Sequence, residues 1–248
     1  VKEDRADIDR LMVTNLAGAS LSATGSLTDL SLTPSGTVDV SIVSADGAEL
    51  ISTLAAQFSG PDWLSLAADR IGATPDLLSD AQLSFIASTA PEDKDRSWTL
   101  SGNAKAASGS ASFTGNWKSG EDLGDADGGW QVTATQREPL NFLSLAGVDL
   151  VPLGAPGPAT VELKANGNPA VSLELEFAYS AEGTSATFAG TRSNGADGPL
   201  LAGKVSLTSD DLDPYLLATG LALPGTGFGT PVTLQTTMSS SGGSLEMK

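Results

Sequence analysis

Apolar and polar residues alternate along most of this chain with a period of two. The clearest run extends from Val171 to Tyr179, where five large apolar side chains fall on one face and mainly serine and glutamate fall on the other. The same alternation recurs over residues 36–42, 98–101, 111–117, 203–208 and 232–238. Successive side chains of a strand point to opposite faces, so this period predicts antiparallel strands with one apolar and one wet face.

Short turns connect the predicted strands. Asn166-Gly167 is the strongest hairpin signal in the chain, because both residues tolerate the positive φ that tight hairpin turns require. Ala181-Glu182-Gly183 provides a second short link. The pattern therefore predicts a mainly β fold, with an extended antiparallel sheet and a few short helices.

Helical spacing of apolar residues is confined to short segments. It predicts a helix over 48–58 and another over 62–71, with Asp62 as the cap of the second. Asp213 and Glu138, each followed by proline, mark two more helix starts, since proline suits the first helical position. We expect these acidic residues to cap their helices and to complement the helix dipole by about 0.3–1 kcal/mol each.

One combination occurs three times: a glycine-led strand, an acidic turn, a short apolar helix and a Gly/Pro exit. The copies begin at Gly36, Gly129 and Gly203, and they suggest sub-repeats at roughly 21–60, 129–165 and 200–238. Units of this kind do not cover their own apolar face and must stack on their neighbours. We expect residues 1–248 to be one segment of a repetitive β domain, with a sub-repeat seam near 120–129.

Composition and charge narrow the choice of partners. The 248 residues are 40% hydrophobic but only 5% aromatic, so aliphatic side chains must supply most of the packing. Thirty acidic and 13 basic residues give a net charge of −17. Nucleic acid is therefore an improbable partner, because neutralising phosphates requires clustered lysine and arginine.

The absence of two residue types narrows the chemistry. Without cysteine there is no thiol nucleophile and no disulfide framework, and without histidine there is no Ser-His-Asp triad and no histidine metal site. The 30 acidic residues could still include a pair of catalytic carboxylates, as in a glycosidase. However, the few aromatic residues, on which sugars usually stack in such sites, are widely spread along the chain. We expect no enzymatic activity and no cofactor.

Two loops resemble ligand sites weakly. Asp122, Asp125 and Asp127 are spaced like part of a calcium loop, but the spacing of a full loop and its bidentate glutamate are missing. A solvated acidic turn explains them better. The glycine-rich stretch 225–229 follows a helix exit and precedes a strand, whereas a phosphate loop opens a helix, so we interpret it as a turn.

The third strand–helix copy and the early stretch 21–40 resemble the AsmA family of Gram-negative envelope proteins, which includes the TamB and YhdP relatives. The resemblance rests on Gly203–Thr208 followed by Asp211–Leu217 and an apolar-Pro exit, and on Leu21–Leu30 followed by Ser35–Val40. It touches about half of the chain. A helical insertion around 48–80 is longer than the plain repeat needs.

The resemblance implies a curved, taco-like sheet in the periplasm, anchored to the inner membrane by an N-terminal helix. Its apolar groove would conduct phospholipid acyl chains towards the outer membrane, and other envelope proteins could be partners. The anchor is not in this sequence, in which no apolar run reaches the roughly 18 residues of a membrane span and the first residues lack the shape of a signal peptide. We therefore expect a fragment of a longer chain.

The alternation predicts which residues would face such a groove. They are Val38, Val40, Ile42, Trp98, Leu100, Phe113, Val171, Leu173, Leu175, Phe177, Val205, Leu207, Val232 and Leu234. A slip of one residue in register would invert this face.

The same alternation fits a second reading. The apolar face could pack against another sheet in a closed sandwich, as in a structural or adhesive extracellular repeat module with a Ser/Thr-rich partner surface. The sequence alone does not distinguish the open groove from the closed core.

Overall fold

The computed structural model of the protein describes residues 4–30, 34–57, 68–72, 74–89, 97–118, 127–145, 148, 150–151, 157–195, 198–221, 229–241 and 244–248. Thirteen strands form in these ranges. They are β1 (Arg5–Leu16), β2 (Ala19–Thr28), β3 (Ser35–Asp46), β4 (Ser79–Thr89), β5 (Ser97–Lys105), β6 (Gly109–Lys118), β7 (Gly128–Gln136), β8 (Ala159–Asn168), β9 (Ser172–Ala181), β10 (Thr184–Gly195), β11 (Gly198–Ser209), β12 (Val232–Ser241) and β13 (Ser244–Met247).

Short helices interrupt the succession of strands. They are α1 (Gly47–Gln57), the 3₁₀ helix η1 (Pro75–Leu78), α3 (Leu140–Leu145) and α4 (Asp213–Ala218). Residues 68–72 are also helical, whereas residues 62–67, with the expected cap Asp62, lie outside the described residues.

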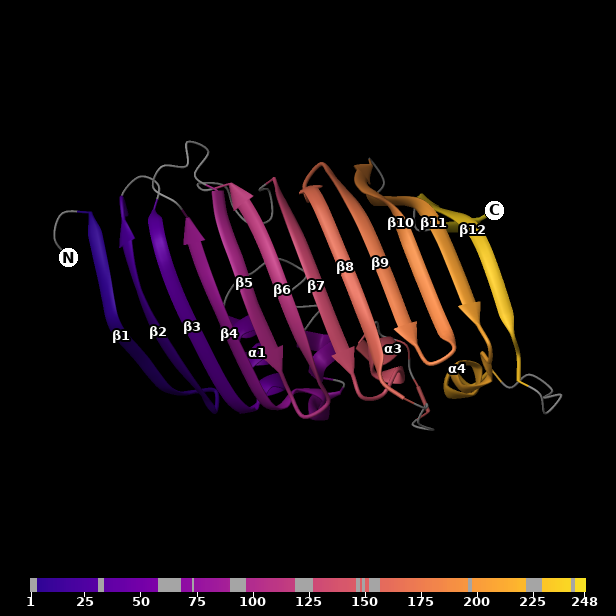
Figure 1. Ribbon diagram of the computed structural model, residues 1–248, viewed down its shortest axis with the longest axis horizontal. Coiled ribbons are helices and arrows are strands. Elements are labelled where there is room, and N and C mark those ends of the chain that lie inside the picture. The colour runs from indigo at the N-terminus through magenta and orange to yellow at the C-terminus, as the bar shows by residue number, and fades with distance from the viewer. Residues whose placement is uncertain are drawn as a thin grey trace. The chain divides into compact units, whose positions relative to one another are not determined.

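All thirteen strands belong to one sheet whose strand order is the order of the chain (Figure 1). The predicted fold class is confirmed, because the protein is mainly β, with a curved antiparallel sheet and a few short helices. Within the described residues the sheet does not close on itself. Alternating side chains and short connections between successive strands account for this meander.

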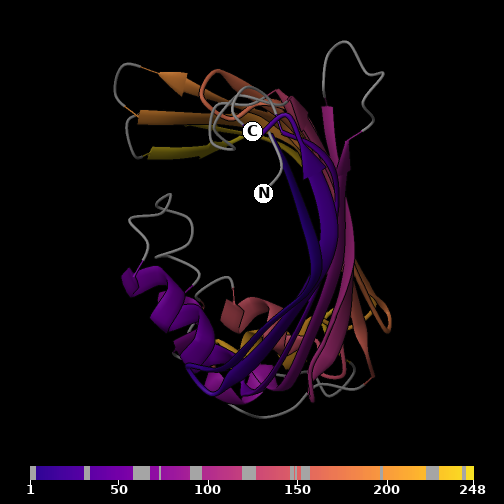
Figure 2. The same cartoon turned by 90° about the vertical axis from the view of Figure 1, so that its left-hand side faces the viewer.

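Two compact units divide the chain, Val1–Trp130 and Gln131–Lys248. We call them the N-terminal and the C-terminal unit. Figure 2 shows that the strands of the N-terminal unit bend along their length and that α1 lies on the concave side.

The three strand–helix copies seen in the sequence correspond to β3–α1, β7–α3 and β11–α4. A helix thus follows every fourth strand in the sheet order. Because neighbouring strands are antiparallel, strands four places apart run in the same direction. The helices accordingly follow strands of one direction only.

The start of α1 shows how the acidic turn works locally. One carboxylate oxygen of Asp46, the last residue of β3, accepts hydrogen bonds from the backbone N–H groups of Ala48 and Glu49, both at 3.0 Å. This caps two of the free N–H groups of the first turn. Ala48 and Leu50 are then buried against the sheet, where α1 contacts β3 and β4.

The expected cap of α4 is wrong in detail. The N-cap residue is Leu212, which makes no side-chain cap bond. Asp213 is the first helical residue, and its carboxylate accepts a hydrogen bond from the hydroxyl of Thr230. The preceding Asp211 instead accepts from the backbone N–H of Asp213 at 2.9 Å.

At α3 the acidic residue acts through its backbone. The carbonyl of Glu138 accepts from the N–H of Asn141 at 3.2 Å, while the side chain is exposed. Pro139 is fully buried at this position, so the proline carries the packing that starts this module.

The predicted hairpin is present between β8 and β9, but its turn does not lie at Asn166-Gly167. Both residues lie inside β8, and the turn comes later, at residues 169–171. Pro169 lacks the N–H that a further ladder bond would need, and the side chain of Asn168 accepts from the N–H of Ala170 at 2.8 Å. Gly167 serves a close cross-strand approach, since an added Cβ would lie 2.5 Å from the carbonyl oxygen of Ser172.

Candidate functional site

Each unit has an apolar sheet face that carries its helices. In the N-terminal unit, cross-strand register aligns Ala23, Val40, Phe85, Gly102 and Phe113 in one row. Polar side chains of the alternate positions fall on the opposite face. We call the helix-bearing side the apolar face and the other side the polar face.

In each unit the apolar face has two ends. The helices lie at one, which we call the covered end. In the N-terminal unit, Ser108 just after β5 donates to the carbonyl of Leu77 in η1 at 2.6 Å, so the last residues of β5 belong to the covered end. Trp98, near the first residue of β5, therefore belongs to the opposite end, which we call the open end.

Three tryptophans stack across the open end of the N-terminal unit. The ring centroids of Trp98 and Trp117 are 6.2 Å apart at an interplanar angle of 12°, and those of Trp117 and Trp130 are 5.7 Å apart at 8°. Offset stacks of this spacing contribute about 0.5–1.5 kcal/mol beyond their burial. The tryptophan ladder gives this end a flat, ordered apolar surface.

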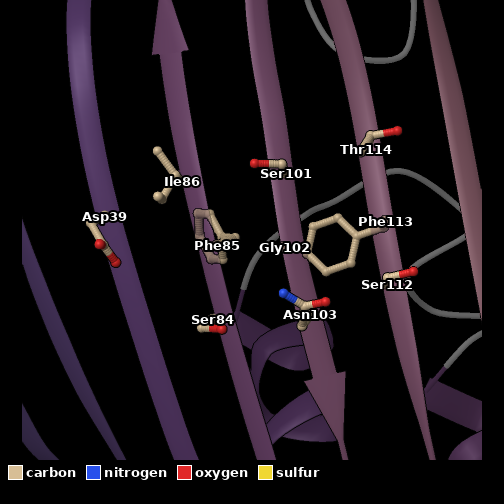
Figure 3. A pocket seen from close by; sticks show the side chains of 10 residues that line it. All are labelled: Asp39, Ser84, Phe85, Ile86, Ser101, Gly102, Asn103, Ser112, Phe113 and Thr114. Atoms are coloured by element: carbon tan, nitrogen blue, oxygen red, sulfur yellow. The ribbon is translucent and has the colours of Figure 1, made fainter.

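Glycines make room for these rings. A Cβ at Gly115 would lie 2.3 Å from Cε3 of Trp130. At Gly102 it would lie 2.5 Å from Cζ of Phe113 and 2.7 Å from Cβ of Phe85, and Figure 3 shows these two rings beside Gly102. The aromatic rings lie over the bare backbone of neighbouring strands, a known device for holding a curved sheet.

The C-terminal unit repeats the arrangement with aliphatic residues and phenylalanine. One row of its apolar face contains Leu163, Phe177, Phe188 and Val205. Another row, nearer the turn that joins β8 to β9, contains Leu173, Arg192 and Leu201.

Aromatic contacts join α3 and α4 to this face. The ring of Tyr179 meets Phe142 of α3 and Tyr215 of α4 edge to face, with centroids 6.3 and 6.4 Å apart. The two tyrosine hydroxyls are 2.9 Å apart and hydrogen-bonded. Burial, together with this hydrogen bond, raises the pKa of the Tyr179 hydroxyl. Tyr179 therefore stays neutral, and the hydrogen-bonded pair serves as a structural link.

Most of the buried apolar side chains lie at the covered end. Among the described residues, the buried apolar side chains are Ala19, Ala23, Ala48, Leu50, Leu140, Ala159 and Ala218. Large side chains elsewhere on the apolar face are only partly buried, and Leu163 and Leu234 are 39% and 42% exposed. In the described residues, the rest of the apolar face is thus partly exposed to solvent.

Thirteen of the fourteen residues predicted to line a groove lie on the apolar face of their unit. In the N-terminal unit these are Val38, Val40, Ile42, Trp98, Leu100 and Phe113. In the C-terminal unit they are Leu173, Leu175, Phe177, Val205, Leu207, Val232 and Leu234. Val171 is the exception, because it lies in the turn before β9 and is 67% exposed.

Sequence reasoning left several residues of this face out. Leu83 and Phe85 belong to β4, where Ile86 stands on the polar face and blurs the alternation. Trp117 and Trp130 stand in alternating strands, but only the register shows that they stack with Trp98. Arg192 was also missed, although counting in twos from Phe188 would have placed it on this face.

A shallow hollow of about 370 Å³ lies over β3 to β6 (Figure 3). Its wall is formed by Asp39, Ser84, Ser101, Asn103, Ser112 and Thr114, together with Phe85, Ile86, Gly102 and Phe113. Asp39 is the one titratable group in this lining. Acid–base or nucleophilic chemistry needs two or more groups in defined geometry, which this hollow does not bring together.

The described residues contain no group of three or more metal-ligating side chains. Asp122 and Asp125 of the candidate calcium loop lie outside the described residues, so that weak candidate stays a prediction. None of the described helices has the length and apolar content needed to span a membrane.

Comparisons with models of protein families, with curated proteins and with solved structures give no match to this chain. The AsmA resemblance rests on sequence pattern alone.

Proposed function

We propose that this chain is a non-enzymatic, lipid-handling segment of an AsmA-like envelope protein. The acyl chains of phospholipids would lie on the apolar face. The protein would act in the periplasm, held at the inner membrane by a segment outside this sequence, in lipid transport or outer-membrane assembly. Other envelope proteins are further candidate partners.

The observation that carries the proposal is the partly exposed apolar face. A closed sandwich would bury Val40, Phe85 and Phe177 between two sheets, whereas the described strands form one sheet and leave these side chains partly exposed. Within the described residues, helices cover one end of the face only. Contiguous exposed apolar surface of this kind marks an interaction site in soluble proteins.

Apolar contact alone would supply the binding energy. Burial of a CH₂ group from an acyl chain contributes about 0.8 kcal/mol. A lipid tail could therefore bind this face firmly without any specific polar contact.

Photocrosslinking tests the proposal directly. A photoreactive phenylalanine analogue is placed at Leu173, Val205 or Leu207 on the apolar face, or at Ser172 or Ser206 on the polar face of the same strands. The purified variants are irradiated with phosphatidylethanolamine–phosphatidylglycerol vesicles, and adduct masses are measured. We expect lipid adducts at the first three positions only.

The control positions make the outcome decisive. Ser172 and Ser206 are the chain neighbours of apolar-face positions, so each control shares its strand with a test position and differs only in the face. Adducts at both sets, or at neither set in variants with native circular dichroism, would overturn the proposal. As a second variant, L173D/L175D is expected to weaken lipid binding while the chain stays folded.

One observation favours the adhesive alternative. The polar face of β10 to β12 is rich in hydroxyl side chains, such as Ser185, Thr187, Thr208 and Thr233, as a hydrogen-bonding partner surface would be. A single sheet is less expected for that function than a closed sandwich.

A further inference from the structure

One charged side chain stands on the apolar face away from the helices. In the described strands β2 to β12, the apolar-face positions carry two charged residues, Asp46 and Arg192. Asp46 caps α1. Arg192 lies in β10 between Leu173 of β9 and Leu201 of β11.

The guanidinium is held at the open end of the C-terminal unit. Its Nη1 donates to the carbonyl of Pro169 at 2.8 Å, in the turn between β8 and β9. This is the one hydrogen bond that the described residues provide to it. A guanidinium has five N–H donors in a planar fork, so the fork keeps donors for a second, anionic partner.

The surroundings select the kind of anion. The chain carries a net charge of −17, which repels small anions from solution. An anion that brings its own apolar tail gains the burial energy of the neighbouring leucines. Phosphate and carboxylate both match the guanidinium fork, in which charge-assisted bonds form in pairs.

The apolar face is long enough for such a tail. Eight residues separate Arg192 from Thr184 at the covered end of β10, which at about 3.4 Å per residue is roughly 27 Å. One lipid tail spans about 15 Å, half of a bilayer's hydrocarbon core. Leu175, Phe177 and Val205 lie in the rows between the two ends.

We infer that Arg192 binds the anionic head group of an acyl-chain amphiphile, a phosphate ester or a carboxylate, whose tail extends over the apolar face towards the helices. This inference rests on the proposed function and adds a preference for anionic over neutral lipids. It makes Arg192 a determinant of ligand specificity.

Calorimetric titration with single-chain probes tests the inference. The probes are myristoyl lysophosphatidylglycerol, myristate and neutral monomyristoyl glycerol, each below its aggregation threshold. The variants are R192Q, which removes the charge and keeps an N–H donor for Pro169, and R192K, which keeps the charge. K204Q is the matched control, because Lys204 stands on the polar face of the adjacent strand and its loss changes the net charge equally.

We expect R192Q to weaken the binding of the anionic probes roughly 10-fold to 100-fold, as for the loss of a charge-assisted bond. The neutral probe should bind R192Q within about twofold of the parent chain, by the same reasoning. R192K should restore part of the loss, and K204Q should bind all probes like the parent. A loss for only one anionic probe would identify the head group as phosphate or carboxylate, and would support the inference.

Three results separate failure of the inference from failure of the proposed function. If R192Q weakens the binding of neutral and anionic probes equally, Arg192 has only a structural role in holding the turn between β8 and β9. If K204Q weakens the anionic probes as much as R192Q does, the effect is general electrostatics. Either result overturns the inference while lipid binding stands. If the parent chain binds no probe at all, both proposals fall.

Discussion

The covered end and the open end of the apolar face differ in the size of the side chains that meet there. Where the helices pack, the buried sheet residues are small, as at Ala19, Ser44, Ala159 and Ser209. At the open end the face carries Trp98, Trp117, Leu173 and Leu201. Small residues let a helix approach the sheet closely, whereas large ones build a surface of their own.

This difference separates two tasks. The covered end supplies the buried contacts from which most folding free energy derives. The open end keeps large apolar side chains accessible. It orders them by stacking and by packing aromatic rings over the backbone of glycines in neighbouring strands. Substitutions at the two ends should therefore have different consequences, which three predictions examine.

The largest effect is expected at the covered end. Leu140 of α3 is 5% exposed, so L140A should lower the free energy of unfolding by about 2–5 kcal/mol, the range for deleting a buried leucine. L173A, at the partly exposed open end, should lower it by about 1 kcal/mol. Urea unfolding followed by circular dichroism measures both.

Lipid binding should respond in the opposite order. L173A removes apolar contact area and should weaken the binding of myristate, whereas L140A should leave it unchanged at temperatures where the variant stays folded. Equal stability losses in the two variants would mean that Leu173 lies in a closed core, against the proposed open face.

The apolar face could be predicted from the sequence because of its period. Over residues 37–42 of β3, 172–179 of β9 and 203–208 of β11 the alternation is regular, so Val40, Phe177 and Val205 fall on the expected side. β1 was not predicted, since its register shifts between Ile8 and Leu11 and again between Val13 and Leu16. A shift of this kind breaks the period on which the prediction depends.

Relations between strands could not be predicted. The stacking of Trp98 on Trp117 requires that β5 and β6 pair in one particular register, and one sequence does not specify a cross-strand register that far from its turn. The turn between β8 and β9 lies later than the Asn-Gly pair predicts for a local reason. Pro169, two residues after Gly167, ends the ladder of backbone hydrogen bonds and starts the turn there. The period alone would have placed Arg192 on the apolar face, but its position between Leu173 and Leu201 depends on the register of other strands.

The tryptophan ladder provides the second prediction, of intermediate size. G115A places a methyl group where it would lie 2.3 Å from Cε3 of Trp130, so this ring must move away. We expect a loss of about 1–3 kcal/mol, as for overpacking, and a reduced near-ultraviolet circular dichroism signal from the stacked indoles. S112A, on the polar face of the same strand, is the control and should leave that signal intact. An unchanged spectrum in G115A would show that the open end is not ordered by this stack.

The smallest effect compares two hydroxyl pairs on the same two strands. Thr184 and Ser209 are hydrogen-bonded at 2.7 Å and buried at the covered end, while Thr187 and Ser206 are hydrogen-bonded at 2.7 Å on the polar face, where Thr187 is exposed. T184V leaves the buried hydroxyl of Ser209 without its hydrogen-bond partner and should lower the free energy of unfolding by about 1–2 kcal/mol. T187V leaves Ser206 within reach of water and should change it by less than about 0.5 kcal/mol. Valine and threonine are both β-branched and suit strands about equally, so the difference between the variants in urea unfolding reports burial alone. If the two variants lose the same stability, the covered end is no drier than the polar face, and the distinction between the two ends fails.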